Sequence, residues 1–255
     1  MSTNIQNAKN LINTFVTGDV DVARELLDEN YIQHNQDYPT GAAGFIAAVE
    51  SLAQAPVKTS AKIVRAFEDG DKVFLHTIYN FAGAGEVVAF DILRFNDQGK
   101  FVEHWDNLDG LTPANPSGRT QTDGALTTTT ADKEETRALV TNFVKDVLHG
   151  ENLEKLTSYF DGDNYIQHNS GIADGVSGLG EALAALAQAG LSMTYTKTYQ
   201  VLAQDDFALV VSEGEFAGRH VAFYDLFRVE NGFIAEHWDI IQDIKEESAN
   251  TNGKF

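Results

Sequence analysis

The spacing of hydrophobic residues changes from a helical period to a strand period along the chain, and this order then repeats. Over residues 4–17 the apolar side chains recur every three or four positions, which predicts a helix. Residues 21–27 and 42–53 predict two further helices in the same way. Apolar and polar residues then alternate, as is typical of β-strands, over residues 58–67, 72–81, 87–95 and 100–108. Helices that precede the strands, rather than alternating with them, indicate an α+β fold.

The second half of the chain follows the same order. Helices are predicted over residues 133–148, 153–160 and 179–189, and four strands follow. Tyr31-Ile-Gln-His-Asn35 recurs 134 positions later as Tyr165-Ile-Gln-His-Asn169, and Glu103-His-Trp-Asp106 recurs as Glu236-His-Trp-Asp239 after the loss of one residue in a turn. Each copy, at roughly 110–120 residues, has the size of a small domain, so we predict two tandem domains.

A segment with almost no apolar content separates the copies. Residues 112–132 include Pro113, Pro116 and a threonine run at 127–130, a composition that is typical of a linker or an ordered strap. We therefore predict a first domain over residues 1–111, a linker over 112–132 and a second domain over 133–247. The last residues, 248–255, resemble the beginning of the linker and are predicted to form a matching tail.

Charge and composition narrow the classes of partner. The net charge of −20 repels phosphate backbones and anionic lipids, so we expect neither nucleic acid nor a membrane surface as a partner. The chain has no cysteine, which excludes disulfides, thiolate catalysis and cysteine-bound zinc. No apolar run has the length of a membrane span, and the first ten residues lack the apolar core of a signal peptide. We therefore expect a cytoplasmic protein.

Three polar patches recur in both copies and are candidates for chemistry. They are the Tyr-Ile-Gln-His motif, an aspartate inside an apolar strand (Asp91 and Asp225), and the Glu-His-Trp-Asp motif. A buried carboxylate needs a hydrogen-bonding partner, and a carboxylate beside a histidine is suited to general acid–base catalysis. The structural alternative is that each strand aspartate pairs with an arginine, Arg94 or Arg228, or with a histidine as part of a structural network.

The hairpin before the last patch leaves the position of the aspartates open. A two-residue turn at Asn231-Gly232 places Asp225 opposite Trp238. Because side chains alternate between the faces of a strand, Asp225 and Asp239 then lie on opposite faces unless a bulge intervenes.

Motifs for other chemistries are absent from the sequence. It contains no glycine-rich phosphate loop, no serine-hydrolase motif and no dinucleotide fingerprint. His34, His104 and Asp106 have the residue types of a metal triad, but their spacing resembles no metal motif. We therefore expect no metal.

The order of motifs resembles the SnoaL-like branch of the nuclear-transport-factor-2-like superfamily, in particular its polyketide cyclases and aldol-condensation proteins. The resemblance rests on the Tyr-Ile-Gln-His-Asn and His-Trp-Asp motifs and covers about residues 4–111 and 133–245. It implies a cone-shaped domain in which a curved antiparallel sheet, closed by three helices, surrounds an apolar cavity. It also implies that the two copies pair as an internal pseudo-dimer; whether the chain self-associates further stays open.

The resemblance further implies acid–base chemistry without a cofactor on a small-molecule carbonyl compound. The catalytic candidates are Asp91, Asp106, His34 and His104 in the first copy and Asp225, Asp239, His168 and His237 in the second. The residues expected to line the pockets and bind the ligand are Tyr31, Trp105, Tyr165 and Trp238.

Three functions remain open at this point. The first is an enzyme that catalyses aldol cyclisation or isomerisation of a small apolar carbonyl compound, with a hydrolytic variant carried by Asp106 and Asp239. The second is a non-catalytic module that binds a small hydrophobic ligand. The third is a structural protein whose cavities are filled by its own side chains. Because a fold does not determine an activity, the sequence alone leaves it undecided whether the chain is an enzyme.

Overall fold

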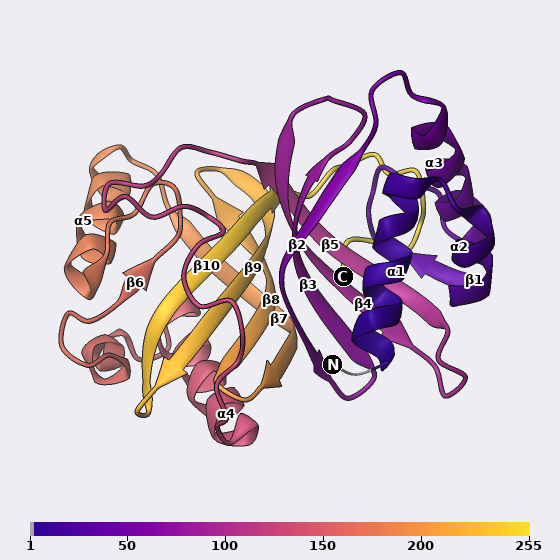
Figure 1. The fold of residues 1–255 in the computed structure, drawn as a ribbon. Helices are drawn as coiled ribbons and strands as arrows, with labels where there is room; N and C mark the ends of the chain where they lie inside the picture. The colour runs from indigo at the N-terminus through magenta and orange to yellow at the C-terminus, as the bar shows by residue number, and fades with distance from the viewer. Residues whose placement is uncertain (1–2) are drawn as a thin grey trace. The chain divides into compact units, whose positions relative to one another are not determined.

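The chain, described over residues 3–255 by a computed structural model, divides into two compact units (Figure 1). Unit 1 comprises the chain up to Leu111 together with Lys245–Phe255, and unit 2 comprises Thr112–Ile244. Each unit is built on one five-stranded sheet formed by the described residues. The two-domain α+β prediction is therefore confirmed, while the internal pseudo-dimer stays a prediction.

Unit 1 packs three helices on one face of its sheet (Figure 1). The helices are α1 (Thr3–Thr17), α2 (Val20–Leu26) and α3 (Ala42–Gln54). The strands are β1 (Leu27–Gln33), β2 (Ser60–Asp69), β3 (Lys72–Asn80), β4 (Glu86–Phe95) and β5 (Phe101–Gly110). They lie in the order β1-β5-β4-β3-β2, and every pair is antiparallel except β1–β5, which is parallel.

The helical period in the sequence produces the core of unit 1. The apolar face of α1 buries Ala8, Leu11 and Ile12 against strand residues that include Val73 and Leu75. The start of α2 is fixed by Asp19, whose carboxylate accepts the backbone N–H groups of Asp21 and Val22 at 3.2 Å.

Unit 2 repeats this architecture with a less regular helical layer. Its helical segments are α4 (Lys133–Phe143), the π-helical turn η1 (Val144–Leu148), the 3₁₀ helix η2 (Leu153–Tyr159) and α5 (Gly175–Gln188). Its strands are β6 (Ile166–Gln167), β7 (Met193–Gln204), β8 (Phe207–Phe216), β9 (Arg219–Glu230) and β10 (Phe233–Asp243). They lie in the equivalent order β6-β10-β9-β8-β7.

The second helical layer differs from the sequence prediction in two places. Residues 153–160 form the 3₁₀ helix η2 in place of a short α-helix. The last helix begins at Gly175 rather than at residue 179, and within its first turn the backbone of Gly178 passes against Ala173 more closely than a residue with a side chain could. An added Cβ at Gly178 would lie 2.4 Å from the Ala173 carbonyl oxygen.

The predicted linker and tail are ordered parts of the two units. Residues 112–132 belong to unit 2, and the tail, with its boundary at Lys245 rather than 248, belongs to unit 1. The side-chain amide of Asn115 donates to the carbonyl oxygens of Gln167 and Ile172, and that of Asn250 donates to those of Asn35 and Tyr38. The bonds to Gln167 and Asn35 satisfy carbonyl groups that are buried. We call residues 112–132 strap 1 and residues 245–255 strap 2.

No helix within the described residues 3–255 has the length and apolar character needed to cross a membrane.

Candidate functional site

A bulge brings two aspartates face to face in each sheet. In unit 2 the register shifts between Ile234 and Glu236, so Asp225 lies opposite Asp239 rather than opposite Trp238. In unit 1 a shift beside Arg94 places Asp91 opposite Asp106. The extra residue of each bulge turns the carboxylates to the same face, which regular strand alternation would not do.

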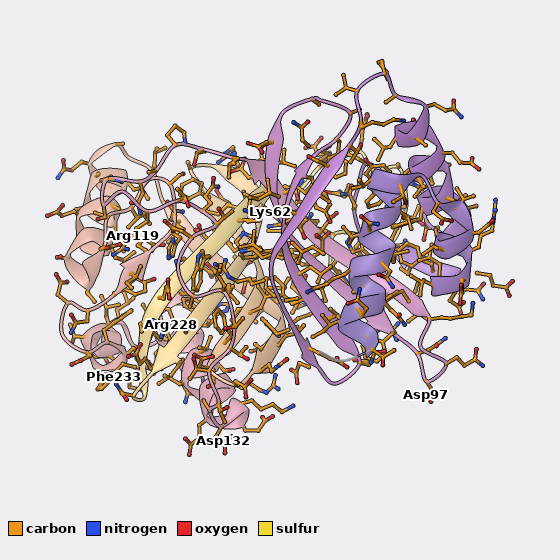
Figure 2. All side chains as sticks on the ribbon, in the orientation of Figure 1. Lys62, Asp97, Arg119, Asp132, Arg228 and Phe233 are labelled. Carbon is orange, nitrogen blue, oxygen red and sulfur yellow. The ribbon has the colours of Figure 1, made fainter. Side chains whose placement is uncertain are left out.

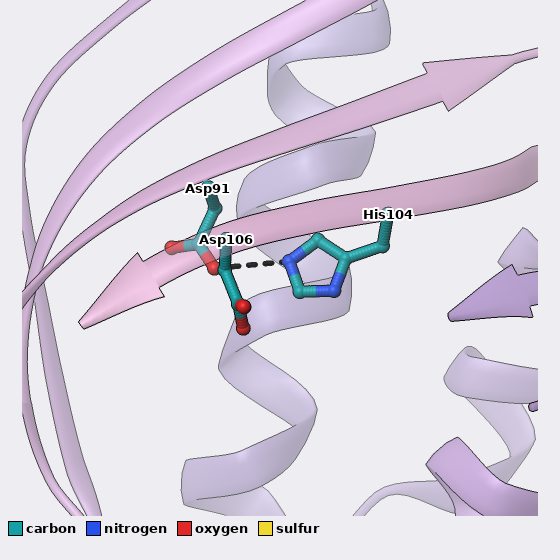
Figure 3. Close-up of side chains that lie close together, drawn as sticks. All are labelled: Asp91, His104 and Asp106. Carbon is teal, nitrogen blue, oxygen red and sulfur yellow. Dashed lines mark hydrogen bonds and ion pairs between the residues drawn. The ribbon is translucent and has the colours of Figure 1, made fainter. Parts of the chain in front are cut away.

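A histidine two positions before the second aspartate joins this face in unit 1 (Figure 3). His104 Nε2 lies 3.1 Å from Asp91 Oδ1, and its other ring nitrogen, Nδ1, lies 3.0 Å from Gln33 Oε1. Gln33 is brought there by the parallel pairing of β1 with β5, in which it is the register partner of His104. All three members of the Asp91–His104–Asp106 cluster are buried.

The hydrogen-bond network determines how many protons the His104–Asp91 pair carries. Gln33 Oε1 also accepts the backbone N–H of Asn35, so it is an acceptor and His104 Nδ1 must carry a hydrogen. A second hydrogen is required between Nε2 and the Asp91 carboxylate. The pair therefore holds one shared proton and has no net charge, while Asp106 adds a negative charge beside it.

Unit 2 contains the same network at equivalent positions. His237 Nε2 lies 3.0 Å from Asp225 Oδ1, and His237 Nδ1 lies 2.9 Å from Gln167 Oε1. Gln167 Oε1 accepts two backbone N–H groups, at 2.9 Å each, which fixes its amide orientation. Asp239 accepts the side-chain amide of Asn169 at 2.7 and 3.0 Å.

A tyrosine hydroxyl completes each network from a different strand. In unit 1 Tyr79, on β3, donates to Asp91 at 2.9 Å. In unit 2 Tyr195, on β7, lies 3.2 Å from Asp225 Oδ2. The strand partner of Tyr195 is Gly214, and an added Cβ there would lie 1.9 Å from the backbone oxygen of Thr194. Each strand aspartate therefore has a tyrosine hydroxyl within hydrogen-bond distance. The tyrosine lies on β3 in unit 1 and on β7 in unit 2, where its partner on β8 is a glycine.

Burial and neighbouring charges shift the titration of the unit 1 cluster. Burial raises the pKa of Asp91, because the hydrogen bonds from His104 and Tyr79 only partly offset the loss of water. The pKa of His104 is also raised: burial opposes the imidazolium, but the hydrogen bond to Asp91 and the charges of Asp106 and Asp91 outweigh it. Burial likewise raises the pKa of Tyr31, Tyr79, Tyr165 and Tyr195, so their hydroxyl groups stay protonated.

These shifts predict that unit 1 loses stability as the pH rises above neutrality. The folded chain binds the His104 proton more tightly than the unfolded chain does. This contribution is therefore complete below the ordinary histidine pKa of 6.5 and is lost as the pH rises through the folded pKa. The raised pKa of Asp91 acts in the same direction at more acidic pH. The midpoint of urea unfolding should fall between about pH 6 and about pH 9. His104→Gln should remove most of that slope, whereas the exposed His220→Gln should keep it; equal slopes in all three proteins would contradict the assignment.

The two clusters open into cavities of very different size. In unit 2, Asp225, His237 and Asp239 lie in the wall of a cavity of about 390 Å³ whose remaining lining is mostly apolar. In unit 1, Asp91, His104 and Asp106 border a space of about 60 Å³. Within residues 3–255, no lysine or arginine lines either cavity. Only the unit 2 cavity lies in the size range of small-molecule sites.

Four of the residues expected at the sites lie elsewhere. His34, His168, Trp105 and Trp238 do not line the two cavities. Strand alternation explains this, because Gln33 and Gln167 face the clusters and the histidine that follows each of them faces the other side of the sheet. There His34 stacks on Trp105 at 5.0 Å and His168 stacks on Trp238 at 4.7 Å. These four residues therefore lie away from both cavities, and their predicted roles stay predictions.

The outer histidines fasten the straps instead. His34 Nδ1 lies 3.0 Å from the carbonyl oxygen of Gly253, and His168 Nδ1 lies 2.8 Å from that of Thr120. Their Nε2 atoms lie 2.9 Å from Glu103 and Glu236, which also accept Arg94 and Arg228. Arg228 and the strap residue Arg119 are labelled in Figure 2. The arginines pair with these glutamates and not with Asp91 and Asp225, so of the two structural alternatives only the pairing of each aspartate with a histidine is present.

The clusters contain the residue types of a metal site. Asp91, His104 and Asp106 offer ligand atoms within 4.8 Å of one another, and so do Asp225, His237 and Asp239. Such a set could coordinate a divalent cation. The hydrogen bonds described above already use the ring nitrogens of both histidines and carboxylate oxygens of Asp91, Asp225 and Asp239, whereas Asp106 Oδ1 is buried without a hydrogen-bond partner among the described residues.

Four predicted site residues meet at one cavity: Tyr165, Asp225, His237 and Asp239. Gln33 and Gln167 belonged to the first candidate patch but were given no role, and Asn35 and Asn169 were missed, although their identity in both repeats was a usable signal. Tyr79 and Tyr195 carried no such signal, because the repeat alignment puts them on different strands. Tyr31 is buried beneath the unit 1 cluster and is not in the lining of its cavity.

Comparisons with known proteins match part of unit 1 to a domain family. Residues 8–104, from α1 to β5 of unit 1, match the family model of the SnoaL-like domain. No functionally curated protein matches the chain. Among solved structures, the chain is similar to TsrD from Streptomyces laurentii, with 22% identity, coverage of 41% of this chain and 86% of that one, and a TM-score of 0.36.

Two further structures are similar over a comparable part of the chain. One is an NTF2-like protein of unknown function from Cytophaga hutchinsonii, with 19% identity, coverage of 43% and 92%, and a TM-score of 0.37. The other is an LEH-like epoxide hydrolase from M. tuberculosis, with 19% identity, coverage of 42% and 82%, and a TM-score of 0.36. Residues 8–104 thus match the SnoaL-like domain, and unit 2 repeats the sheet order of unit 1.

Proposed function

We propose that unit 2 catalyses proton transfer on a small, uncharged, largely apolar carbonyl compound, as in isomerisation or intramolecular aldol ring closure. The observation that carries the proposal is the Asp225–His237–Asp239 cluster in the wall of a 390 Å³ apolar cavity. Apolar walls with a few convergent polar groups are typical of small-molecule sites. The two acidic side chains, without lysine or arginine in the described lining, disfavour a carboxylate or phosphate substrate.

Asp239 is assigned as the base that touches the substrate. It is the less deeply buried of the two aspartates, and Asn169 holds its carboxylate in one orientation. Asp225 and His237 are positioning residues, because their neutral, proton-sharing pair lies beside Asp239 and is itself held by Gln167 and Tyr195. A fixed neutral partner leaves the negative charge of the cluster on Asp239.

Tyr165 is assigned as the donor to the substrate oxygen. Its hydroxyl oxygen lies 3.4 Å from Gln167 Nε2, which donates to it, so its own hydrogen can point into the cavity. Burial raises the pKa of Tyr165, which keeps the hydroxyl protonated. A preorganised donor at the carbonyl oxygen stabilises the negative charge that develops when the adjacent carbon loses its proton.

The reaction conserves atoms and electrons without a cofactor. Asp239 removes a proton from the carbon next to the carbonyl group, and the electron pair of the broken C–H bond moves into the enolate. In an isomerisation, Asp239 returns the proton to another carbon. In an aldol ring closure, the enolate carbon bonds to a second carbonyl carbon of the same molecule, and the resulting alkoxide takes the proton from Asp239.

The second candidate function is a purely binding role, and the polar groups in the cavity wall disfavour it. Two carboxyl groups and an imidazole in an apolar cavity cost desolvation free energy that a binder of hydrophobic ligands would avoid. The experiment that tests catalysis uses 2-tetralone, a neutral bicyclic ketone, in D₂O. Wild-type protein should accelerate exchange of its α-hydrogens, followed by ¹H NMR, with EDTA present to remove cations. Exchange no faster than in buffer, with the probe bound, would favour the binding role.

Removal of the Tyr165 hydroxyl should slow this exchange without abolishing it. Tyr165→Phe loses one donor to the developing oxyanion, and the expected decrease in rate is about 10²-fold. Tyr31→Phe, the same change in unit 1, is the matched control and should leave the rate unchanged. Equal rates for wild type and Tyr165→Phe would remove Tyr165 from the mechanism.

A further inference from the structure

We infer that the two copies of the cluster have different roles: each chain has one ligand site, in unit 2, whereas the unit 1 cluster is a closed centre that anchors strap 2 through Lys254. The inference rests on the proposed function for the identity of the reacting copy. It goes beyond it by assigning a structural role to Asp106, the counterpart of the proposed base. Three separate observations support it: the cavity volumes, the aromatic packing around them, and the charges beside each cluster.

Aromatic rings fill the unit 1 cavity. Phe15, on α1, lies 4.8 Å from Phe45 and 6.2 Å from Phe81 between ring centroids. Phe81 in turn stacks on Tyr79 at 4.8 Å. The remaining space of about 60 Å³ accepts a few water molecules but no organic molecule of two rings.

The last helix of each layer shows the same contrast. In α3, Phe45 and Val49 are 5% and 0% exposed, because they pack on the core of unit 1. The repeat places Leu179 and Leu183 at these positions of α5, and Leu183 is 39% exposed. Both leucines line the 390 Å³ cavity instead of filling it. Leu179 is smaller than its counterpart Phe45, and Leu183 is not packed into a core as Val49 is. These two differences leave room for a ligand in unit 2.

A buried lysine balances the charge of the unit 1 cluster. Lys254 is 5% exposed; its Nζ donates to the backbone oxygen of Asp106 at 2.6 Å and lies 3.8 Å from Asp106 Oδ1. The His104–Asp91 pair is neutral, so the cluster together with Lys254 has no net charge. A buried carboxylate that faces a buried cation is suited to holding a segment in place rather than to accepting a substrate proton.

The cationic residue of strap 1 does not pair with the aspartate of the unit 2 cluster. Ala114-Asn-Pro-Ser-Gly-Arg119 and Ala249-Asn-Thr-Asn-Gly-Lys254 share their alanine, asparagine and glycine, and both asparagines dock on the loop after the first strand. Arg119 nevertheless pairs with Asp174, at 3.0 and 3.1 Å, on the rim of unit 2. Strap 2 thus places a cation beside Asp106. Strap 1 places its cation beside Asp174 and not beside Asp239, the counterpart of Asp106.

A matched pair of cavity-filling substitutions tests the inference. Ala48 and Ala182 are equivalent in the repeat and line the cavities of unit 1 and unit 2, respectively. The probe is Nile red, a neutral fluorescent dye, titrated into the full chain. Wild type should bind one Nile red per chain. Ala182→Leu should weaken binding by about 10-fold or more with little change in melting temperature, because the added atoms occupy open space. Ala48→Leu should leave binding unchanged and lower the melting temperature by several degrees, because it overpacks a filled core.

Each other outcome has a defined meaning. Two dye molecules per chain, no dye binding, or weaker binding in Ala48→Leu than in Ala182→Leu would overturn the inference. Equal losses of melting temperature in the two variants would also overturn it, because unit 2 would then be as filled as unit 1. If one dye binds and Ala182→Leu displaces it while 2-tetralone does not exchange, the proposed function fails and the inference stands.

Discussion

Asp239→Asn is expected to lower the rate of α-hydrogen exchange in 2-tetralone by about 10²–10⁴-fold, the range associated with loss of a general base. The substitution keeps the size of the side chain and removes only its ability to take a proton. Asp239 lines the 390 Å³ cavity, and the amide of Asn169 keeps its carboxylate in place. Because binding depends mainly on apolar contacts, Nile red should bind the variant almost as tightly as it binds wild type.

Asp106→Asn is the matched control for this experiment. Asp106 occupies the equivalent position in the repeat but borders the 60 Å³ space of unit 1. Its substitution should leave the exchange rate of folded protein within about two-fold of wild type, a difference that corresponds to less than about 0.5 kcal/mol in the barrier. A large loss in Asp106→Asn together with a small loss in Asp239→Asn would reverse the assignment of the reacting unit.

Lys254→Met is expected to produce the largest loss of stability among the substitutions considered. Lys254 and Asp106 are 5% and 4% exposed, so the change leaves a buried carboxylate without its cation and a backbone oxygen without its donor. Removal of one partner of a buried ion pair costs about 3–5 kcal/mol. The urea unfolding transition of unit 1 should shift accordingly, and tryptophan fluorescence reports it through Trp105, which is buried in that unit.

Two further variants separate the charge of Lys254 from its packing. The double variant Lys254→Met/Asp106→Asn should recover part of the lost stability, because it removes the unpaired charge as well as the cation. Arg119→Met, in the equivalent place of strap 1, should cost about 1 kcal/mol or less, because the side chains of Arg119 and Asp174 are partly exposed, at 42% and 30%. A loss in Arg119→Met as large as in Lys254→Met would show that the straps, and not the Asp106 charge, account for the effect.

The candidate site was only partly predictable because its geometry depends on one inserted residue per hairpin. The Asn231-Gly232 turn predicts a regular register in which Asp225 faces Trp238, but the bulge beyond it makes Asp225 face Asp239. Whether an extra residue is accommodated in the turn or in the strand depends on the packing of both faces of the sheet. His34 and His168 lie away from the clusters because their strands are regular. Alternation along the first strand of each sheet turns these histidines to the outer face, beside Trp105 and Trp238.

The helices, the four long strands that follow them, the duplication, and the residue types of the repeated Asp–His–Asp sets could be predicted from the sequence, because periodicity and internal identity are read along one chain. The first strand of each sheet, β1 or β6, lies between helices and was not predicted. Which of these residues meet, which strand supplies the tyrosine hydroxyl, and which unit keeps a cavity became visible only in three dimensions. These features depend on register and on side-chain volume summed over distant segments. Phe15, Phe45 and Phe81 fill one cone, Leu179 and Leu183 leave the other open, and Lys254 reaches Asp106 from 148 positions away. A short stretch of sequence records each residue but not the space that remains when all of them pack.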